Sequence, residues 1–366
     1  IIKANQQIFK YTFIVNILQN TLRLTGLLIF IFLGFKSYAI IGSYLLGIIS
    51  IILGSYLGAR LYISKVMSKE EANTTAKQTI INSFISYSWP IIFVGFVGTI
   101  LYWIDSIVIG YLIDTTSVGI YGAAFTIVSL LGIAPELFMQ MFLPVILREY
   151  SKGKTNVIKQ ISKQVSKWIG IINIPAFTLM FLFPEIIINL LFGNQYLGAS
   201  ASLRILAIGG FFSSFTSLNT NLLSMKGKSK SILATLVIAS IINLVLDFFL
   251  VSSYGIEGAA ISTSLVWFLT LVALSIQVYN STKIFAVRRK LINLFFLSLI
   301  PTLILAFFGA SLSITLMESL GGIVFYCLAY ILLLILNKSL DKKDHTLIKK
   351  ALRVLKSRDF RALSQN

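Results

Sequence analysis

Ten apolar segments separated by short polar connections occupy almost the whole chain. Each has about the 20 residues that an α-helix needs to cross a bilayer, whereas a spanning strand would need only about ten alternating residues. A helix also satisfies its backbone hydrogen bonds internally, as lipid requires. The sequence therefore predicts an all-α integral membrane protein with about ten transmembrane helices. The segments are 11–34, 39–63, 81–104, 117–147, 165–191, 202–224, 231–252, 256–279, 290–312 and 318–337.

The composition leaves no room for a sizeable soluble domain. Of the 366 residues, 57% are hydrophobic and 12% are charged, whereas a soluble domain has about 25% charged residues. The formal net charge of +18 does not indicate a nucleic-acid partner, because the basic residues form short clusters between apolar segments. One cysteine and one histidine provide neither an intrachain disulfide nor a Cys/His metal site. We therefore expect the chain to lie in the lipid bilayer. We expect no cofactor.

Lysine and arginine mark every second connection. Of the 31 basic residues, 28 lie in one alternating set of connections and termini, two lie in the other set, and Arg23 lies within a helix. Because basic residues collect in cytoplasmic loops, the pattern predicts a multi-pass protein of the cell membrane with both termini of this chain in the cytoplasm. The basic tail, 338–366, is expected either to lie on the inner leaflet as an amphipathic helix or to be solvated.

A short internal repeat suggests a duplicated architecture. Residues 37–42 (SYAIIG) and 253–258 (SYGIEG) share Ser, Tyr, Ile and Gly, and each lies between two apolar segments. Transporters are commonly built from duplicated halves. If the first two helices match the seventh and eighth, four further helices are expected before Ile1. The predicted division is 1–70 for the last two helices of a first lobe, 71–284 for a complete six-helix second lobe, 285–337 for two additional transmembrane helices and 338–366 for the tail.

An ordered series of short motifs runs through the third to eighth predicted helices. The motifs are Trp103-Ile104-Asp105, VGIYGAA at 118–124, Pro144, Leu191-Phe192-Gly193 with Tyr196, LRILA at 203–207, LSMKGK at 223–228, Asn243, Leu246-Asp247 and GIEGAA at 255–260. In order and spacing the series resembles the polysaccharide (O-antigen-type) flippases of the multidrug/oligosaccharidyl-lipid/polysaccharide exporter superfamily. The resemblance covers about residues 5–280, and it implies two six-helix lobes around a central cavity, with the first four helices missing from this chain.

The resemblance implies a transporter and not an enzyme. Its expected activity is export of a polyprenyl-pyrophosphate-linked oligosaccharide by alternating access for cell-surface polysaccharide synthesis, with glycan polymerase machinery as an expected partner. One alternative is a cation-coupled multidrug antiporter of the same superfamily. Another is a membrane glycan polymerase or glycosyltransferase, which would need a large outer loop carrying catalytic acids. The outer loops of this chain are too short for that role.

Asn16, Asn20 and Arg23 form the first candidate substrate-binding group. They fall at positions i, i+4 and i+7 of the first predicted helix and therefore share one face. An arginine facing a cavity can bind a pyrophosphate through two parallel hydrogen bonds. The alternative is an arginine that pairs with a carboxylate inside the helix bundle for packing alone.

Three acidic residues within predicted helices are candidates for H⁺ or Na⁺ coupling, namely Asp105, Glu136 and Asp247. A charged side chain at a helix centre costs about 2.5–3.5 kcal/mol on insertion scales, so each needs a compensating role. The alternative for each is a hydrogen-bonded structural acid. Near Glu136, Pro135 removes a backbone donor and is expected to free a carbonyl oxygen.

Two asparagines complete the candidate substrate-binding residues. Asn243 precedes Asp247 by one helical turn, and Asn219 lies in the sixth predicted helix, which is unusually rich in Ser, Thr and Asn. Such residues either line a passage for sugars or hydrogen-bond one helix to another. The sequence contains no recognisable nucleophile–base pair or phosphate-binding loop, so no catalytic residue is predicted.

Overall fold

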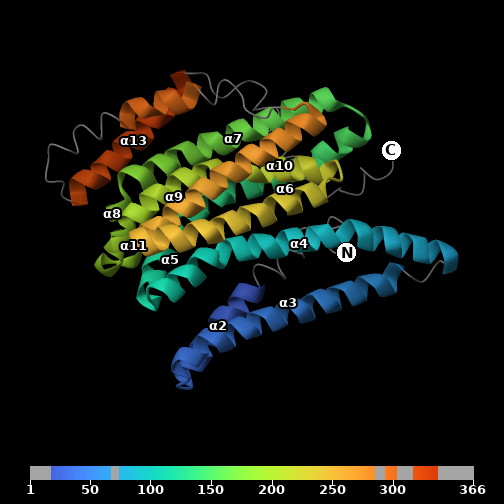
Figure 1. Cartoon of the computed structure of the whole chain (residues 1–366), viewed down its shortest axis with the longest axis horizontal. Coiled ribbons are helices and arrows are strands. Elements are labelled where there is room, and N and C mark those ends of the chain that lie inside the picture. Colours follow the sequence, from blue (N-terminus) through green and yellow to red (C-terminus); the bar gives the residue numbers. More distant parts are fainter. Residues whose placement is uncertain (1–17, 67–73, 285–292, 303–315, 337–366) are drawn as a thin grey trace. The chain divides into compact units, whose positions relative to one another are not determined.

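The computed structural model describes residues 18–66, 74–284, 293–302 and 316–336 (Figure 1). Every regular element within these ranges is helical, which confirms the all-α prediction. The predictions for Asn16 and for the tail, 338–366, fall outside the described residues. The elements are α2 (Gln19–Phe32), α3 (Lys36–Val66), α4 (Thr74–Leu112), α5 (Thr115–Ser129), η3 (Leu130–Gly132), α6 (Ile133–Ser151), α7 (Thr155–Leu182), α8 (Pro184–Phe192), η4 (Asn194–Ala199), α9 (Ser200–Ser213), α10 (Thr216–Met225), α11 (Ser229–Thr282), a helix at Asn293–Thr302 and α13 (Leu316–Leu336).

Six stretches of the described chain are helical, long and apolar enough to cross a membrane. They coincide with seven of the ten predicted segments, because the longest stretch, Ser229–Thr282, contains two of them. The other three predicted segments coincide with α2, Asn293–Thr302 and α13. The chain is therefore a multi-pass membrane protein.

The described helices belong to two compact units. The first unit contains α2 and α3, which pack against each other along their length. Gly26 permits this close approach, because a Cβ atom there would lie 2.8 Å from Leu46 Cδ1. The chain reverses between the two helices at Gly34, whose φ of +83° favours glycine. The second unit begins at Asn82 within α4 and contains the helices that follow.

The fourth predicted segment is not one continuous helix. It breaks into α5 and α6 at the short 3₁₀ helix η3. The cause is Pro135, which has no N–H to bond the carbonyl of Leu131 four residues earlier. Asn173 Nδ2, from α7, donates a hydrogen bond to this carbonyl at 2.8 Å. The predicted freeing of a carbonyl by Pro135 is thus confirmed, and the freed oxygen joins two helices.

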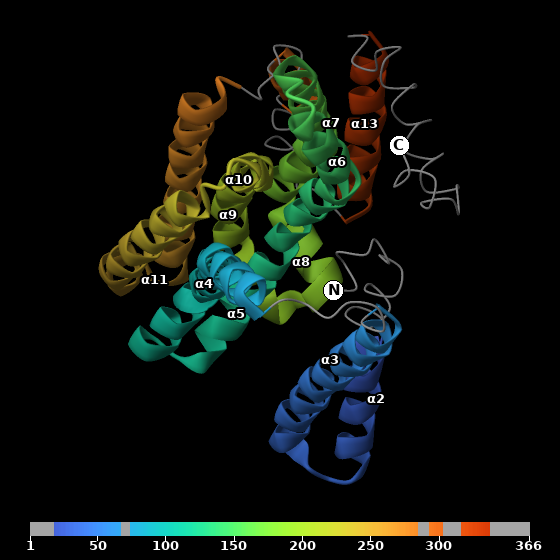
Figure 2. The ribbon, with the colours of Figure 1, turned by 90° about the vertical axis from the view of Figure 1, so that its right-hand side faces the viewer.

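Helix α13 is attached to α7 in a similar way. Pro175 lies within α7 and leaves the carbonyl of Ile171 without its helical partner. The hydroxyl of Tyr330, from α13, donates to that carbonyl at 2.9 Å. Ile174, Tyr326 and Tyr330 are buried in the same apolar cluster, and Figure 2 shows α13 alongside α7.

Helix α11 is a hairpin of two antiparallel arms. Gly255 has non-helical backbone angles (φ 59°, ψ −139°) and reverses the chain. Ser231 on the first arm donates a hydrogen bond to Gln277 on the second at 2.9 Å. The two arms are the yellow and orange ribbons that meet near the α11 label in Figure 1. The second copy of the internal repeat therefore contains a turn, whereas in the first copy the turn at Gly34 precedes the repeated residues.

Gly258→Ala is expected to lower the thermal stability of the purified protein. A Cβ atom at Gly258 would lie 2.1 Å from the carbonyl oxygen of Leu250, which is too close for any rotamer to relieve. Overpacking of this kind costs about 1–3 kcal/mol. The matched control is Gly119→Ala, where a Cβ would meet no atom within 4 Å. Equal melting temperatures for the two variants in detergent would contradict the hairpin geometry.

The second unit has two chemically different ends. One buried cluster joins residues near the α4–α5 turn, α8, η4 and the Gly255 turn. A second cluster joins residues near the α6–α7 turn, the α10–α11 turn and both extremities of α11. The connections around the second cluster contain five of the nine lysines described in this unit. We therefore name the end of the unit at the second cluster the basic end, and the end at the first cluster the opposite end. The lysine-rich connections of this unit and its connections with few basic residues therefore lie at different ends of the unit.

Candidate functional site

A buried polar network lies where α4, α5 and the two arms of α11 meet. Each of its six residues is at most 1% exposed. An ionisable group inside a membrane helix normally faces a bundle interior or a polar partner because lipid solvates it poorly. The network consists of Asp105 on α4, Tyr121 on α5, Asn243 and Asp247 on the first arm of α11, and Ser262 and Thr263 on the second arm.

Local structure explains why these residues meet. Asn243 and Asp247 are four residues apart, so they occupy the same face of the first arm. The reversal at Gly255 then places Ser262 and Thr263 opposite Asn243. Helix α5 begins at Thr115 because the Asp114 side chain accepts a hydrogen bond from the backbone N–H of Ser117 at 2.6 Å.

Asp105 accepts hydrogen bonds from α5 and from both arms of α11. The hydroxyls of Tyr121 and Thr263 both donate to its Oδ2 atom, the latter at 2.6 Å. The amide Nδ2 of Asn243 donates to its Oδ1 atom at 3.3 Å. All three donors are neutral, so they stabilise a negative charge on Asp105 without cancelling it.

Asn243 stands at the centre of the network. Its Nδ2 atom lies 3.1 Å from Asp247 Oδ2, 3.0 Å from Ser262 Oγ and 3.4 Å from Thr263 Oγ1, in addition to its contact with Asp105. An amide NH₂ group has two hydrogens for these four acceptors. The Asn243 amide therefore cannot satisfy every neighbouring oxygen at once.

Two oxygens of the network have no hydrogen-bond partner among the residues that the structure describes. They are Oδ1 of Asn243 and Oδ1 of Asp247, and both residues are fully buried. A buried polar atom without a partner costs about 1–3 kcal/mol. The two carboxyl groups also both lie within hydrogen-bond distance of one nitrogen, so they would repel each other if both were ionised.

This arrangement is suited to binding a proton or a metal cation. It offers carboxylate, amide and hydroxyl oxygens, which are the ligands that hard cations prefer. None of the hydrogen bonds and ion pairs described for its members involves Lys, Arg or His. A cation bound between Asp105 and Asp247 would neutralise the repulsion between their carboxylates.

The structure brings together three predicted site residues from two helices, namely Asp105, Asn243 and Asp247. Tyr121, Ser262 and Thr263 were not predicted as site residues. Tyr121 lies within the VGIYGAA motif at 118–124, and that position was the available signal. Nothing in the sequence distinguishes Ser262 and Thr263 from the many other hydroxyl residues, because their role depends on the α11 hairpin.

Glu136 lies apart from this network. It is exposed in the first turn of α6 and accepts a hydrogen bond from Gln140 Nε2 at 3.1 Å. This i, i+4 contact lies within one helix and joins no other element. The structure therefore gives Glu136 a different setting from Asp105 and Asp247, and its predicted role in ion coupling stays a prediction.

Arg23 lies in the first unit and is half-buried. Its guanidinium carbon is 3.2 Å from the ring centroid of Tyr44 on α3, which is a cation–π arrangement. Helices α2 and α3 contain no acidic residue that could pair with it. Gly47 lies beside the side chain, and a Cβ there would meet Arg23 Cβ at 3.5 Å, an ordinary van der Waals contact. Asn20 precedes Arg23 by one turn and has an interaction of its own.

Asn219 forms a contact between helices. It is 5% exposed, and its Nδ2 atom donates to Ser275 Oγ on the second arm of α11 at 2.9 Å. This geometry corresponds to the structural alternative that the sequence left open, and a substrate-binding role for Asn219 stays a prediction.

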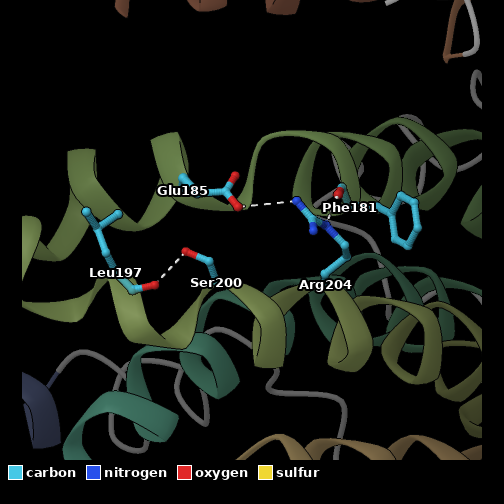
Figure 3. A network of polar contacts seen from close by, with 5 residues as sticks. All are labelled: Phe181, Glu185, Leu197, Ser200 and Arg204. Atoms are coloured by element: carbon cyan, nitrogen blue, oxygen red, sulfur yellow. Dashed lines mark hydrogen bonds and ion pairs between the residues drawn. The ribbon is translucent and has the colours of Figure 1, made fainter. Parts of the chain in front are cut away.

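Arg204 caps the C-terminal end of α7 and also forms an ion pair with α8. The last carbonyls of a helix have no partner within the helix, and Arg204 Nε donates to the carbonyl of Phe181 at 3.0 Å. Arg204 Nη2 also contacts Glu185 Oε1 on α8 at 3.2 Å (Figure 3). Because both side chains are about half exposed, the ion pair itself contributes little, and the arginine serves mainly to connect α7, α8 and α9.

Comparison with known proteins decides the family. The sequence model of a family described as "Polysaccharide biosynthesis protein" matches residues 3–201, which is more than half of the chain. The chain belongs to this family. The match extends from the first unit into the second and includes Asp105 and Tyr121.

Curated relatives of this family member include proteins named as transporters. A "Probable low-salt glycan biosynthesis flippase" of Haloferax volcanii is 26% identical over 50% of this chain and 39% of its own length. A "Putative O-antigen transporter" of Shigella flexneri is 25% identical over 46% and 40%. An uncharacterised membrane protein of Methanocaldococcus jannaschii is 29% identical over 66% and 47%. The chain thus spans less than half the length of these relatives.

A solved structure shows the same fold. The lipid II flippase MurJ in an inward closed conformation matches 88% of this chain and 67% of its own length, with a TM-score of 0.64 and 20% sequence identity. At that identity the likeness establishes the fold and does not establish the substrate.

Proposed function

We propose that this chain forms part of a cation-coupled flippase that exports a polyprenyl-pyrophosphate-linked oligosaccharide by alternating access. The family and the names of the glycan flippase and the O-antigen transporter among its relatives support the substrate class. The observation that carries the coupling mechanism is the buried network around Asn243, where two carboxyl groups and two unpartnered oxygens lie together.

The proposed coupling follows from the positions of these residues. Asp105 and Asp247 come from different helices, and Asn243 contacts both. A bound proton or cation draws α4 and the first arm of α11 together, and its departure leaves two like charges that favour separation. A ligand shifts a conformational equilibrium when it binds one state better than the other. Cation binding and release would therefore bias the lobe between two arrangements.

The proposed substrate contact is the Arg23 guanidinium. Its position over the ring of Tyr44 restricts the side chain while its N–H groups remain able to bind phosphate oxygens. An anionic pyrophosphate substrate suits such a residue, whereas a cationic drug does not. Asn16 and Asn20, which precede Arg23 on the same predicted face, would bind sugar or phosphate oxygens.

Removal of the gene for this protein from its host tests the proposed function. The expected result is loss of surface glycan and accumulation of the lipid-linked oligosaccharide in the inner leaflet, where it is protected from glycosidase added to intact cells. The control is restoration of surface glycan by the full-length protein. Unchanged surface glycan combined with a new sensitivity to cationic drugs would contradict the proposal and favour the multidrug antiporter.

A further inference from the structure

Two turns at the basic end of the second unit have the same sequence and the same backbone geometry. The α6–α7 turn contains Lys152-Gly153-Lys154, and the α10–α11 turn contains Lys226-Gly227-Lys228. The central glycines have φ values of +68° and +71°. In each turn the glycine N–H bonds the carbonyl three residues earlier at 2.9 Å, and the following lysine N–H bonds the carbonyl five residues earlier at 3.0 Å. Each turn is thus a helix C-cap of the Schellman type.

The two turns lie next to each other. The ammonium group of Lys226 is 5.3 Å from the ring centroid of Tyr150, which ends α6 just before the other turn. Tyr150 and Met225 also pack against the same buried cluster as Ile158 and Ile232. Segments about 75 residues apart in the sequence therefore present their lysines on one surface.

This surface has a large excess of positive charge. Among the residues described in this unit, Glu149 is the one acidic side chain at the basic end, and it is engaged with Lys152 at 3.9 Å. Three exposed acids, Asp114, Glu185 and Glu257, occupy the opposite end. The cations at the basic end, all exposed or partly exposed, are Arg148, Lys152, Lys154, Lys159, Lys163, Lys226, Lys228, Lys230 and Lys283.

The position of this surface at the membrane indicates which kind of partner it binds. The two Lys-Gly-Lys turns connect helices that span the membrane, so they lie at the level of the lipid headgroups. Lysines near an anionic leaflet are attracted to its phosphate groups. We propose that the paired Lys-Gly-Lys turns form a binding site for the phosphate headgroup of an anionic phospholipid. This site is separate from the Asp105 network, and the proposal does not depend on the transported substrate.

The test is lipid binding by the full-length protein in nanodiscs and by native mass spectrometry. The wild-type protein is expected to retain phosphatidylglycerol in preference to phosphatidylcholine. Each lysine near an anionic surface corresponds to about a fivefold change in affinity, so Lys152→Gln, Lys226→Gln and Lys228→Gln together should lower the affinity for phosphatidylglycerol by roughly 100-fold. The preference should also disappear in 1 M NaCl, where the screening length is about 3 Å.

The matched control replaces the same three lysines by arginine, which keeps the charge and should retain the preference. If the triple glutamine variant does not fold, Lys228→Gln alone should give about a fivefold loss. Equal retention of both lipids by the wild-type protein, or undiminished affinity in the folded glutamine variants, would overturn the proposal. Displacement of the lipid by millimolar inorganic pyrophosphate would also overturn it, because the site would then bind a soluble phosphate.

Discussion

Asp247→Asn is expected to abolish coupled transport while the protein still folds. The substitution preserves the size of the side chain and one carbonyl oxygen, but it removes the charge that a cation would neutralise. Coupling between two ligands typically changes affinity by about 5- to 150-fold, so we expect a loss of roughly 100-fold in the rate of glycan export. Export is measured as surface glycan formed in cells that contain only the variant protein.

The control for this variant is Ser252→Ala, on the same helix arm. Ser252 is exposed, and within the described part of the chain its hydroxyl donates to the carbonyl of Phe249 in its own helix, so export should remain at the wild-type level. Normal export by Asp247→Asn at normal protein abundance would show that the second carboxyl group of the network has no role in transport.

Asp105→Leu is expected to cause the largest loss of stability of any single substitution in the network. It would leave the hydroxyl donors of Tyr121 and Thr263 buried without their acceptor, whereas Asn243 would keep its other acceptors. Each such group costs about 1–3 kcal/mol, and typical proteins have only about 5–15 kcal/mol of stability in total. The expected result is a protein that fails to accumulate in the membrane, or that melts far below the wild type in detergent.

A compensating variant separates this explanation from a simple packing defect. Adding Tyr121→Phe and Thr263→Val to Asp105→Leu removes both stranded donors, and replacing both partners of a hydrogen bond by apolar groups is nearly neutral. The triple variant should therefore be more stable than Asp105→Leu alone. A triple variant that is less stable than the single one would contradict the described hydrogen bonds.

Hydrophobic segments and charge alternation were sufficient to predict the all-helical membrane fold. Lipid allows few backbone structures, so run length alone identifies a helix. The errors occur at breaks and boundaries. The break at η3 depends on Pro135 together with Asn173, which lies 42 residues after Leu131, whose carbonyl it binds. Helix α4 continues to Leu112 although its predicted segment ended at residue 104, since Ile107, Val108 and Ile109 are equally apolar.

The candidate site was only partly predictable for a related reason. The cost of burying an ionisable group marked Asp105 and Asp247 individually, and helical spacing placed Asn243 beside Asp247. The distances between helices depend on the Gly255 reversal and on close contacts such as Gly258 with Leu250. The burial cost also marked Glu136, and the polar composition of the sixth predicted helix marked Asn219; the structure places both outside the network.

The central claim is that the network of Asp105, Asn243 and Asp247 binds a proton or a sodium ion. The most direct measurement is the melting temperature of the purified full-length protein in NaCl and in choline chloride of equal ionic strength, each at pH 6 and pH 8. A ligand that binds the folded state stabilises it, so Na⁺ or the lower pH should raise the melting temperature of the wild type but not that of Asp247→Asn. Identical responses of the two proteins under all four conditions would contradict the claim.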